Sequence, residues 1–147
     1  TRSPLLGMEF AAYQKLWRLA GVDHLHVNAL QSKFWESDES VVRSIKACLT
    51  PMFAPDDRAM PVLSSGQWGG QAPDTYRLTG SIDYIYLAGA GIVAHPGGPA
   101  AGVTAIRQAW EAAVEDIPLQ EYAEDHRELM QSLEKFGKLR SSADRRQ

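Results

Sequence analysis

Hydrophobic side chains along the chain recur at two spacings, one helical and one extended. From residue 7 to residue 20 they return every three or four positions, which predicts an amphipathic helix, and Gly21 stands where a left-handed cap would end it. The next segment, V-D-H-L-H-V-N, alternates every second residue and therefore predicts a strand. Its apolar face carries Leu25 and Val27, and its polar face carries His24, His26 and Asn28.

A polar loop and a helix follow this strand, and the same order of strand, loop and helix then recurs. The first of these helices runs from Val41 to Leu49 and ends before Pro51, which cannot continue it. The second unit has a strand at 60–63, a glycine-rich loop at 66–70 and a short helix at 73–79 closed by Gly80.

A third unit begins with a strand at 82–87 and a loop at 88–91. Its helix carries one apolar stripe, made by Val103, Ile106, Trp110 and Ala113. After Pro118 a terminal helix is predicted from Tyr122, His126, Leu129, Leu133 and Phe136. We therefore divide the chain into residues 1–117, which hold the repeated units, and residues 118–147, which hold the terminal helix and a polar tail.

Strands that alternate with helices predict an α/β fold with a parallel sheet and right-handed crossovers. Three strands alone would leave two long apolar edges unpaired, which stable proteins avoid. A (β/α)8 TIM barrel needs about 250 residues. We therefore expect the 147 residues to be the C-terminal portion of such a barrel, with about three βα units, a preceding helix and a C-terminal helix. Barrel active sites lie in the strand-to-helix loops.

Composition narrows the classes of function. The formal charge of −3 gives no basic surface for nucleic acid, and 44% apolar residues are typical of a globular protein. No run of about eighteen apolar residues could span a bilayer, and the first residues lack the apolar core of a signal peptide, so we expect a cytoplasmic protein with no membrane partner. The single cysteine, Cys48, falls in a helical apolar pattern and is expected to be a buried, inert thiol.

Two glycine-containing loops could bind a phosphate group. Backbone N–H groups in G-A-G at 89–91 can approach an anion without an obstructing Cβ, and S-S-G at 64–66 can do the same from the preceding unit. Glycines also form ordinary tight turns, so either loop alone is weak evidence. The presence of both in adjacent units favours a shared phosphate site.

Lys33 lies seven residues beyond His26, in the loop after the first strand. Its ammonium could stabilise a developing carboxylate or enolate, or it could be a solvated lysine beside the acidic cluster that begins at Glu36. His24 and His26 point the same way, so a zinc pair is conceivable, but no third ligand stands at a familiar spacing. A hydrogen bond from His26 to a phosphate oxygen suits the pattern better.

The roles predicted for the other histidines and for two tryptophans are less specific. His95 precedes a proline in a glycine-rich loop and is expected to be structural, and His126 is expected to be a hydrogen-bonded core histidine. Trp35 and Trp68 fall in loops at the active-site end and could shape a pocket.

Several motifs together resemble the C-terminal part of the large subunit of RuBisCO, from about Gly7 to Ala113. D-H-L-H at 23–26 is similar to the family's D-H-[IL]-H on the sixth barrel strand, and Lys33 follows at the spacing of the family's mobile-loop lysine. P-V-L-S-S-G at 61–66 resembles P-V-A-S-G-G on the seventh strand, and the segment 89–102 resembles the glycine-rich segment after the eighth. Agreement in order and spacing is more specific than any one loop.

The resemblance implies a role for each matching residue. Lys33 would be catalytic and would close over the substrate. Side chains and backbone N–H groups of the strand-end loops would bind a substrate hydroxyl and phosphate groups: His26, Ser64, Ser65, Gly66, Gly89 and Ala90. Magnesium is the implied cofactor, and its ligands, a carbamylated lysine with nearby acidic residues, are expected upstream, so this segment should hold no metal ligand. The implied partners are a phosphorylated sugar and a second subunit, in a homodimer or larger oligomer that shares the site.

Departures from the family's pattern favour a RuBisCO-like protein of the form IV type over a carbon-fixing enzyme. The hinge glycine of the mobile loop is Ser32 here, and an acidic residue becomes Trp35; Ser65 and Ala90 replace glycines. The expected function is a lyase or isomerase that forms a magnesium-stabilised enediolate from a phosphorylated sugar derivative, for enolisation, isomerisation or decarboxylation. The alternatives are a genuine ribulose-1,5-bisphosphate carboxylase and an inactive half-barrel used for binding or assembly. Residues 1–147 alone are expected to be inactive.

Overall fold

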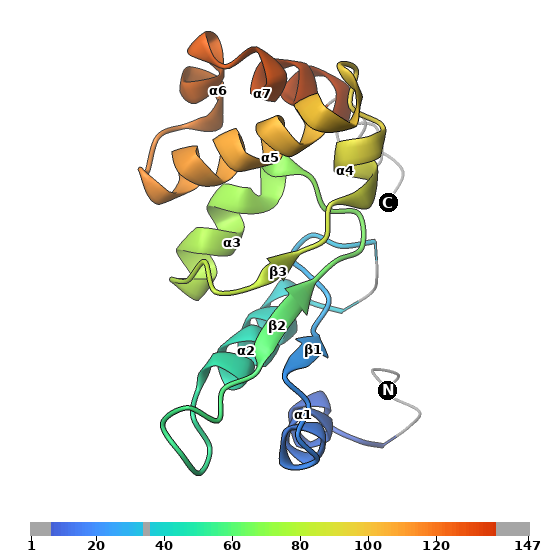
Figure 1. Cartoon of the computed structure of the whole chain (residues 1–147), viewed down its shortest axis with the longest axis vertical. Helices are drawn as coiled ribbons and strands as arrows, with labels where there is room; N and C mark the ends of the chain where they lie inside the picture. Colours follow the sequence, from blue (N-terminus) through green and yellow to red (C-terminus); the bar gives the residue numbers. More distant parts are fainter. Residues whose placement is uncertain (1–6, 34–35, 138–147) are drawn as a thin grey trace. The chain divides into compact units, whose positions relative to one another are not determined.

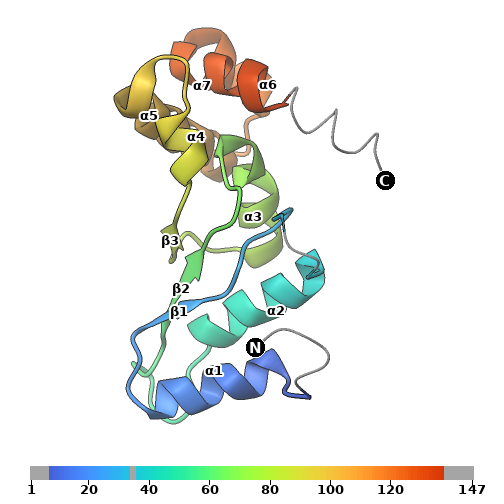
Figure 2. The same cartoon turned by 90° about the vertical axis from the view of Figure 1, so that its right-hand side faces the viewer.

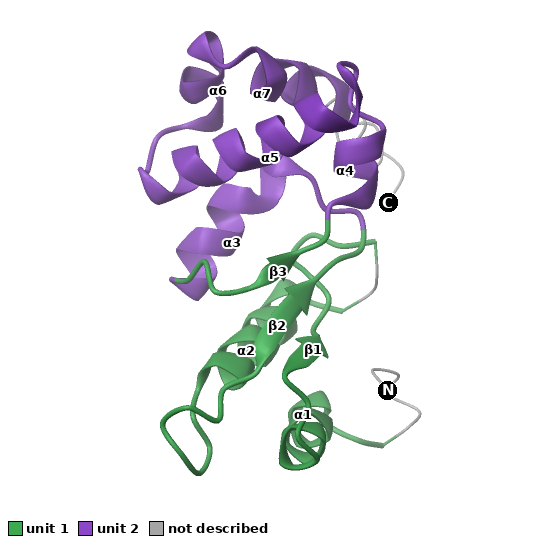
Figure 3. Ribbon diagram, viewed as in Figure 1, with its two compact units in different colours: residues 1–65, 81–87 green, residues 66–80, 88–147 purple. Residues whose placement is uncertain are grey.

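The structure is a computed structural model that describes residues 7–33 and 36–137. It contains two compact units, which Figure 3 distinguishes by colour. Unit 1 comprises residues 1–65 and 81–87, and unit 2 comprises residues 66–80 and 88–147. No helix in the described part of the chain is long and apolar enough to cross a membrane.

Unit 1 is built on a parallel sheet of three strands in the order β1 (His24–His26), β2 (Met60–Leu63) and β3 (Ile85–Tyr86) (Figure 1). His26 pairs with Val62, and Val62 pairs with Ile85. The parallel sheet and the first two strands are therefore confirmed. The strands form an open sheet, so the portion of the barrel that this chain contains is not closed.

The two faces of this sheet differ in burial. Figure 2 shows helix α2 (Asp38–Leu49) along one face, and α2 in turn contacts α1 (Phe10–Leu19). Leu25 and Leu63 are buried, whereas side chains at alternate positions of the sheet are exposed: His24, His26, Met60 and Ile85. Alternation between a covered face and an open face is what a barrel strand requires, because its second face points into the barrel.

Local signals explain where the helices of unit 1 begin and end. Gly21 has a φ of +87° just beyond α1, which confirms the left-handed ending. Ser37 caps α2 by accepting a hydrogen bond from the Ser40 N–H. Glu39 in the first turn has a lowered pKa, because its own backbone N–H and the Ser37 side chain hydrogen-bond its carboxylate. Cys48 is buried and accepts a hydrogen bond from Gln14, as expected of an inert thiol.

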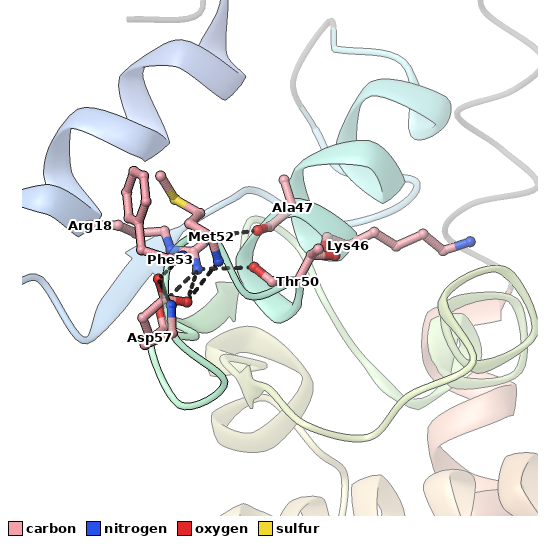
Figure 4. Close-up of polar contacts among 8 residues, drawn as sticks. Arg18, Lys46, Ala47, Thr50, Met52, Phe53 and Asp57 are labelled. Carbon is pink, nitrogen blue, oxygen red and sulfur yellow. Dashed lines mark hydrogen bonds and ion pairs between the residues drawn. The ribbon is translucent and has the colours of Figure 1, made fainter.

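Arg18 joins α1 to the end of α2 and to the loop that follows (Figure 4). Its guanidinium donates to the carbonyl oxygens of Ala47 at 2.7 Å, Thr50 at 3.0 Å and Asp57 at 2.8 Å, and it reaches the Asp57 carboxylate at 3.3 Å. The guanidinium has a planar fork of five N–H donors, so one buried side chain can hold three backbone segments. A lysine ammonium could not match this geometry.

The Asp57 carboxylate also stabilises the loop that follows α2, through hydrogen bonds within the loop itself. It accepts hydrogen bonds from the backbone N–H groups of Met52 at 2.8 Å, Phe53 at 2.6 Å and Ala54 at 3.2 Å. These hydrogen bonds, followed in weight by the nearby Arg18 charge, hold the pKa of Asp57 below its ordinary value of 3.8. The ionised carboxylate is therefore part of the folded loop.

We expect Asp57→Asn to lower the stability of the full-length protein at pH 7, because the amide presents an NH2 group where a carboxylate oxygen accepts N–H groups. The Asp57 pKa is depressed in the folded state, so its contribution is fully present above about pH 3.9 and is lost as the pH falls through the depressed pKa. Urea midpoints of the variant and the wild type should therefore converge in acid.

Asp74→Asn is the matched control for this experiment. Asp74 pairs with Arg77 at 2.9 Å on an exposed helix surface, where ion pairs contribute little. At pH 7, the urea midpoint of Asp57→Asn should be lower than that of Asp74→Asn. Equal midpoints, or a lower one for Asp74→Asn, would contradict the role given to Asp57.

Unit 2 is helical and is packed through small side chains. Its main helices are α3 (Ala72–Thr79), α5 (Gly98–Val114) and α7 (Arg127–Ser132), and α5 contacts the other two. The buried core consists of five alanines and two leucines: Ala72, Ala109, Ala112, Ala113, Ala123, Leu119 and Leu129. Gly80 closes α3 with a φ of +67°, as predicted.

The stripe predicted for α5 is rotated from the face that is actually buried. Val103 is 47% exposed, whereas Gly102, Ala105 and Ala109 are buried. A Cβ at Gly102 would lie 2.4 Å from the Ile92 carbonyl oxygen in α4 (Gly89–Val93), so only glycine permits this approach. Close packing therefore selects the small residues of α5, and the larger apolar residues that dominate the sequence pattern lie toward its edges.

Two further elements differ from the prediction. The strand expected at 82–87 is limited to Ile85–Tyr86, because residues 81–84 form a turn in which the Ser81 hydroxyl accepts from the Asp83 N–H and the Tyr84 hydroxyl donates to the Ser81 carbonyl. The loop expected at 88–91 instead includes the first residues of α4.

The predicted terminal helix is a series of short helical segments. These are α6 (Leu119–Tyr122), a 3-10 turn (Ala123–Asp125), α7 (Arg127–Ser132) and a π-helical turn (Leu133–Gly137). His126 interrupts the series with a non-helical φ of −127°, while its Nδ1 contacts the Tyr122 carbonyl oxygen at 2.5 Å and its ring stacks on Tyr122. His126 is half-buried and hydrogen-bonded, at a helix junction rather than along a continuous stripe.

Candidate functional site

The ends of β1 and β2 in unit 1 bring together three of the predicted site residues. His26 is the last residue of β1, and Ser64 directly follows β2. Their parallel pairing places His26 Nε2 2.5 Å from Ser64 Oγ, although 38 residues separate them in the chain. Ser64 Oγ lies 3.3 Å from Ser65 Oγ. An imidazole and two hydroxyls thus form a continuous hydrogen-bonded chain.

The turn that follows β2 has an uncommon backbone. Ser65 and Gly66 both have a φ of +82°, in the left-handed region. Glycine adopts this region at little cost, whereas a residue with a Cβ is strained there by about 1 kcal/mol or more. The turn imposes this conformation on Ser65.

Lys33 is exposed in the loop between β1 and α2. The loop is anchored on both sides of Lys33: Asn28 donates to the Glu36 carboxylate at 2.7 Å, and the Gln31 N–H donates to the Asp38 carboxylate at 2.7 Å. Trp35, which was predicted to shape a pocket, lies outside the described residues. The structure therefore defines the base of the loop, and the catalytic role of Lys33 stays a prediction.

Unit 2 contains the glycine-rich part of the candidate site. A Cβ on Gly91 would lie 2.9 Å from Trp68 Cβ and 3.0 Å from the Gln67 carbonyl oxygen, so the start of α4 packs directly on the loop after Gly66. A Cβ on Gly89 would meet nothing within 4 Å. Within unit 2, the loop at residues 67–68 and the start of α4 are therefore neighbours, and the backbone at Gly89 is open to an approaching ligand.

Gln71 shapes this loop and was missed by the sequence analysis. Its buried side-chain amide accepts from the Trp68 N–H at 2.9 Å and donates to the Gly66 carbonyl oxygen at 3.2 Å. Both ends of the turn are thus fixed by one side chain. Trp68, expected to shape a pocket, is itself buried, and its ring lies 5.7 Å from that of Phe136.

His95 fixes the segment between α4 and α5. Its Nδ1 accepts from the Gly97 N–H at 3.0 Å, so the ring proton lies on Nε2, which donates to the Glu128 carbonyl oxygen at 2.9 Å. The Glu128 carboxylate has a lowered pKa, chiefly because Gln108 donates a hydrogen bond to it. His95 is buried with both nitrogens hydrogen-bonded, which confirms the structural role predicted for it.

Metal ligands do not gather in the described part of the chain. No group of three or more histidine, cysteine, aspartate or glutamate side chains lies close enough together there to hold an ion. These residues therefore do not fit the magnesium ion that the resemblance implies. His24 and His26 likewise belong to no such group.

Residues 1–136 match the family described as the ribulose bisphosphate carboxylase large chain, catalytic domain. The chain belongs to the RuBisCO large-chain family. A solved RuBisCO-like protein from Burkholderia fungorum is 49% identical and superposes with a TM-score of 0.84 over 87% of this chain and 32% of that one. The resemblance seen in the motifs is therefore confirmed, and the fold is that of part of the RuBisCO catalytic domain.

Two characterised relatives share a substrate name. The chain is 58% identical over 137 residues to 3-oxo-isoapionate-4-phosphate decarboxylase of Rhizobium rhizogenes, covering 92% of this chain and 33% of that protein. It is 49% identical over 123 residues to 3-oxo-isoapionate-4-phosphate transcarboxylase/hydrolase of Xanthobacter autotrophicus, covering 83% of this chain and 30% of that one. The chain thus spans about a third of the length of these RuBisCO-like relatives.

Substitution of two nearby glycines should separate ligand binding from folding. Gly89→Ala adds a Cβ into open space, so the variant should keep the melting temperature of the full-length protein and bind inorganic phosphate more weakly. Gly91→Ala pushes a Cβ against Trp68 and should cost about 1–3 kcal/mol of stability, as other overpacked substitutions do.

Thermal unfolding and isothermal titration with phosphate measure both effects. A Gly89→Ala protein that binds phosphate like the wild type would show that this glycine does not contact the anion. A Gly91→Ala protein of unchanged stability would contradict the packing described for α4.

Proposed function

We propose that the full-length protein is a RuBisCO-like decarboxylase that acts on a phosphorylated 3-oxo sugar acid of the 3-oxo-isoapionate 4-phosphate type. The observation that carries the proposal is the 58% identity to a decarboxylase of that name across 92% of this chain. A second, separate argument comes from the strand-end loops, where the sequence departs from the carboxylase pattern at Ser32, Trp35, Ser65 and Ala90. These departures favour a RuBisCO-like protein over a carbon-fixing enzyme.

The chemistry of a 3-oxo acid suits the residues of this chain. Loss of CO2 breaks the bond between the carboxylate carbon and its neighbour, and the electron pair remains as an enolate conjugated with the 3-oxo group. Cationic and N–H donors aimed at that oxygen lower the barrier. We assign charge stabilisation to Lys33, phosphate binding to the backbone N–H groups of Gly66, Gly89 and Ala90, and binding of a substrate hydroxyl to Ser64.

Other features of the full-length protein belong to the same proposal. Magnesium is expected as the cofactor, because RuBisCO chemistry uses it, and its ligands are assigned to residues outside this chain. A dimer or larger oligomer with the site shared between subunits is expected from the family resemblance. The cytoplasmic assignment remains an expectation from composition.

We expect the purified full-length protein to release CO2 from 3-oxo-isoapionate 4-phosphate and to show no ribulose-bisphosphate-dependent CO2 fixation. Coupled assays of CO2 release and of 14C fixation measure the two reactions. Robust fixation would replace the proposal with a genuine carboxylase. Carboxyl transfer or hydrolysis of the substrate without release of CO2 would align the protein with the Xanthobacter relative. Absence of every reaction from a folded protein would favour the inactive binding module.

Replacement of Lys33 tests its catalytic role. We expect Lys33→Ala to lower kcat by about 100-fold or more with little change in KM, because the ammonium would act mainly on charge that develops in the transition state. Lys46→Ala, on the exposed surface of α2, is the control and should leave both constants unchanged. Equal kcat values for the two variants would return Lys33 to the class of solvated surface lysines.

A further inference from the structure

The hydrogen-bonded chain at the ends of β1 and β2 has a direction, because each serine hydroxyl carries one hydrogen. His26 Nε2 lies 2.5 Å from Ser64 Oγ, which lies 3.3 Å from Ser65 Oγ. If Nε2–H donates to Ser64, then Ser64 donates to Ser65, and the Ser65 hydrogen points away from the chain. If Nε2 accepts instead, both serine hydrogens are used within the chain and Ser65 offers only lone pairs.

A negatively charged ligand selects between these two directions. Phosphate and carboxylate oxygens are acceptors, so they can bind Ser65 only when its hydrogen points outward. That direction requires a proton on His26 Nε2. A histidine that does not itself touch the ligand can thus determine whether a serine two hydrogen bonds away donates to it.

The backbone of Ser65 gives an independent reason to assign it a role. Its φ of +82° is strained for any residue with a Cβ, and Gly66 beside it has the same φ. Strained residues that the surrounding structure maintains gather at ligand sites. The family pattern S-G-G has glycine at this position, so the hydroxyl of Ser65 is an addition that carries a conformational cost.

We propose that Ser65 is a specificity-determining residue whose hydroxyl donates to an oxyanion of the substrate, and that His26 acts through Ser64 as a positioning residue that sets the direction of this hydrogen bond. The proposal rests on the proposed function, since it requires an anionic substrate at the strand-end loops. It adds a side-chain donor to the backbone donors assigned there, and it gives His26 an indirect role.

Ser65→Gly in the full-length protein is the decisive variant, because it removes the hydroxyl and relieves the strained φ together. The probe is inorganic sulfate, which keeps a constant charge near neutral pH, measured by isothermal titration. Loss of one hydrogen bond to a charged group should raise the sulfate Kd about tenfold. The melting temperature should stay the same or rise. A structural role would instead lower the melting temperature.

Asp116→Gly is the matched control. Asp116 is exposed in unit 2 with a φ of +56°, so its replacement relieves comparable strain away from the hydroxyl chain. We expect this variant to keep the wild-type Kd. A double variant, Ser64→Ala with Ser65→Gly, tests whether Ser64 and Ser65 act together in sulfate binding. Ser65→Gly should weaken sulfate binding less in the Ser64→Ala background than in the wild type, because Ser65 has then lost the partner that directs its hydroxyl.

The outcomes are distinguishable. A wild-type Kd for Ser65→Gly, a lowered melting temperature for this variant, or additive effects in the double variant would each overturn the proposal while leaving the proposed function intact. A wild-type protein that binds neither sulfate nor the phosphorylated substrate would overturn the proposed function, and the role of Ser65 with it.

Discussion

Parallel pairing of three short strands is the constraint on which the rest of the arrangement depends. In a parallel sheet every strand ends at the same edge, so the register that pairs His26 with Val62 and Val62 with Ile85 also fixes where the following loops begin. His26 meets Ser64 for this reason alone. Arg18 joins α1 to the end of α2 and to the loop that follows it, and its hydrogen bonds to Ala47 and Asp57 do not involve the candidate site.

The sequence predicted those elements whose burial follows one simple period. The strand at 60–63 and the helix at 73–79 have clear boundaries, with Gly80 as a left-handed cap, and the structure confirms them. The strand at 82–87 is shorter because Ser81 and Tyr84 form local hydrogen bonds that compete with the sheet. The stripe of α5 was displaced because glycine and alanine contacts decide close packing, and hydrophobicity alone does not reveal them.

The sequence located the strand-end loops of the candidate site, but it did not identify the groups that shape them. Glycines and serines after apolar strands identified the loops around Ser64 and Gly89. Gln71 and the partners of His95 gave no signal, because a buried amide or imidazole is defined by distant hydrogen-bond partners rather than by spacing in the chain. The family resemblance supplied roles that residue patterns alone left open, above all for Lys33.

The glycines of α4 and α5 carry different information for comparing relatives. Gly91 and Gly102 press against neighbouring backbone and side chains, so natural selection on folding alone would retain them in descendants that had lost all activity. Gly89 faces open space and is under no such packing requirement. Retention of the first two therefore indicates an inherited scaffold, whereas an alanine or larger residue at Gly89 in a relative would signal a change of ligand in a barrel that still folds.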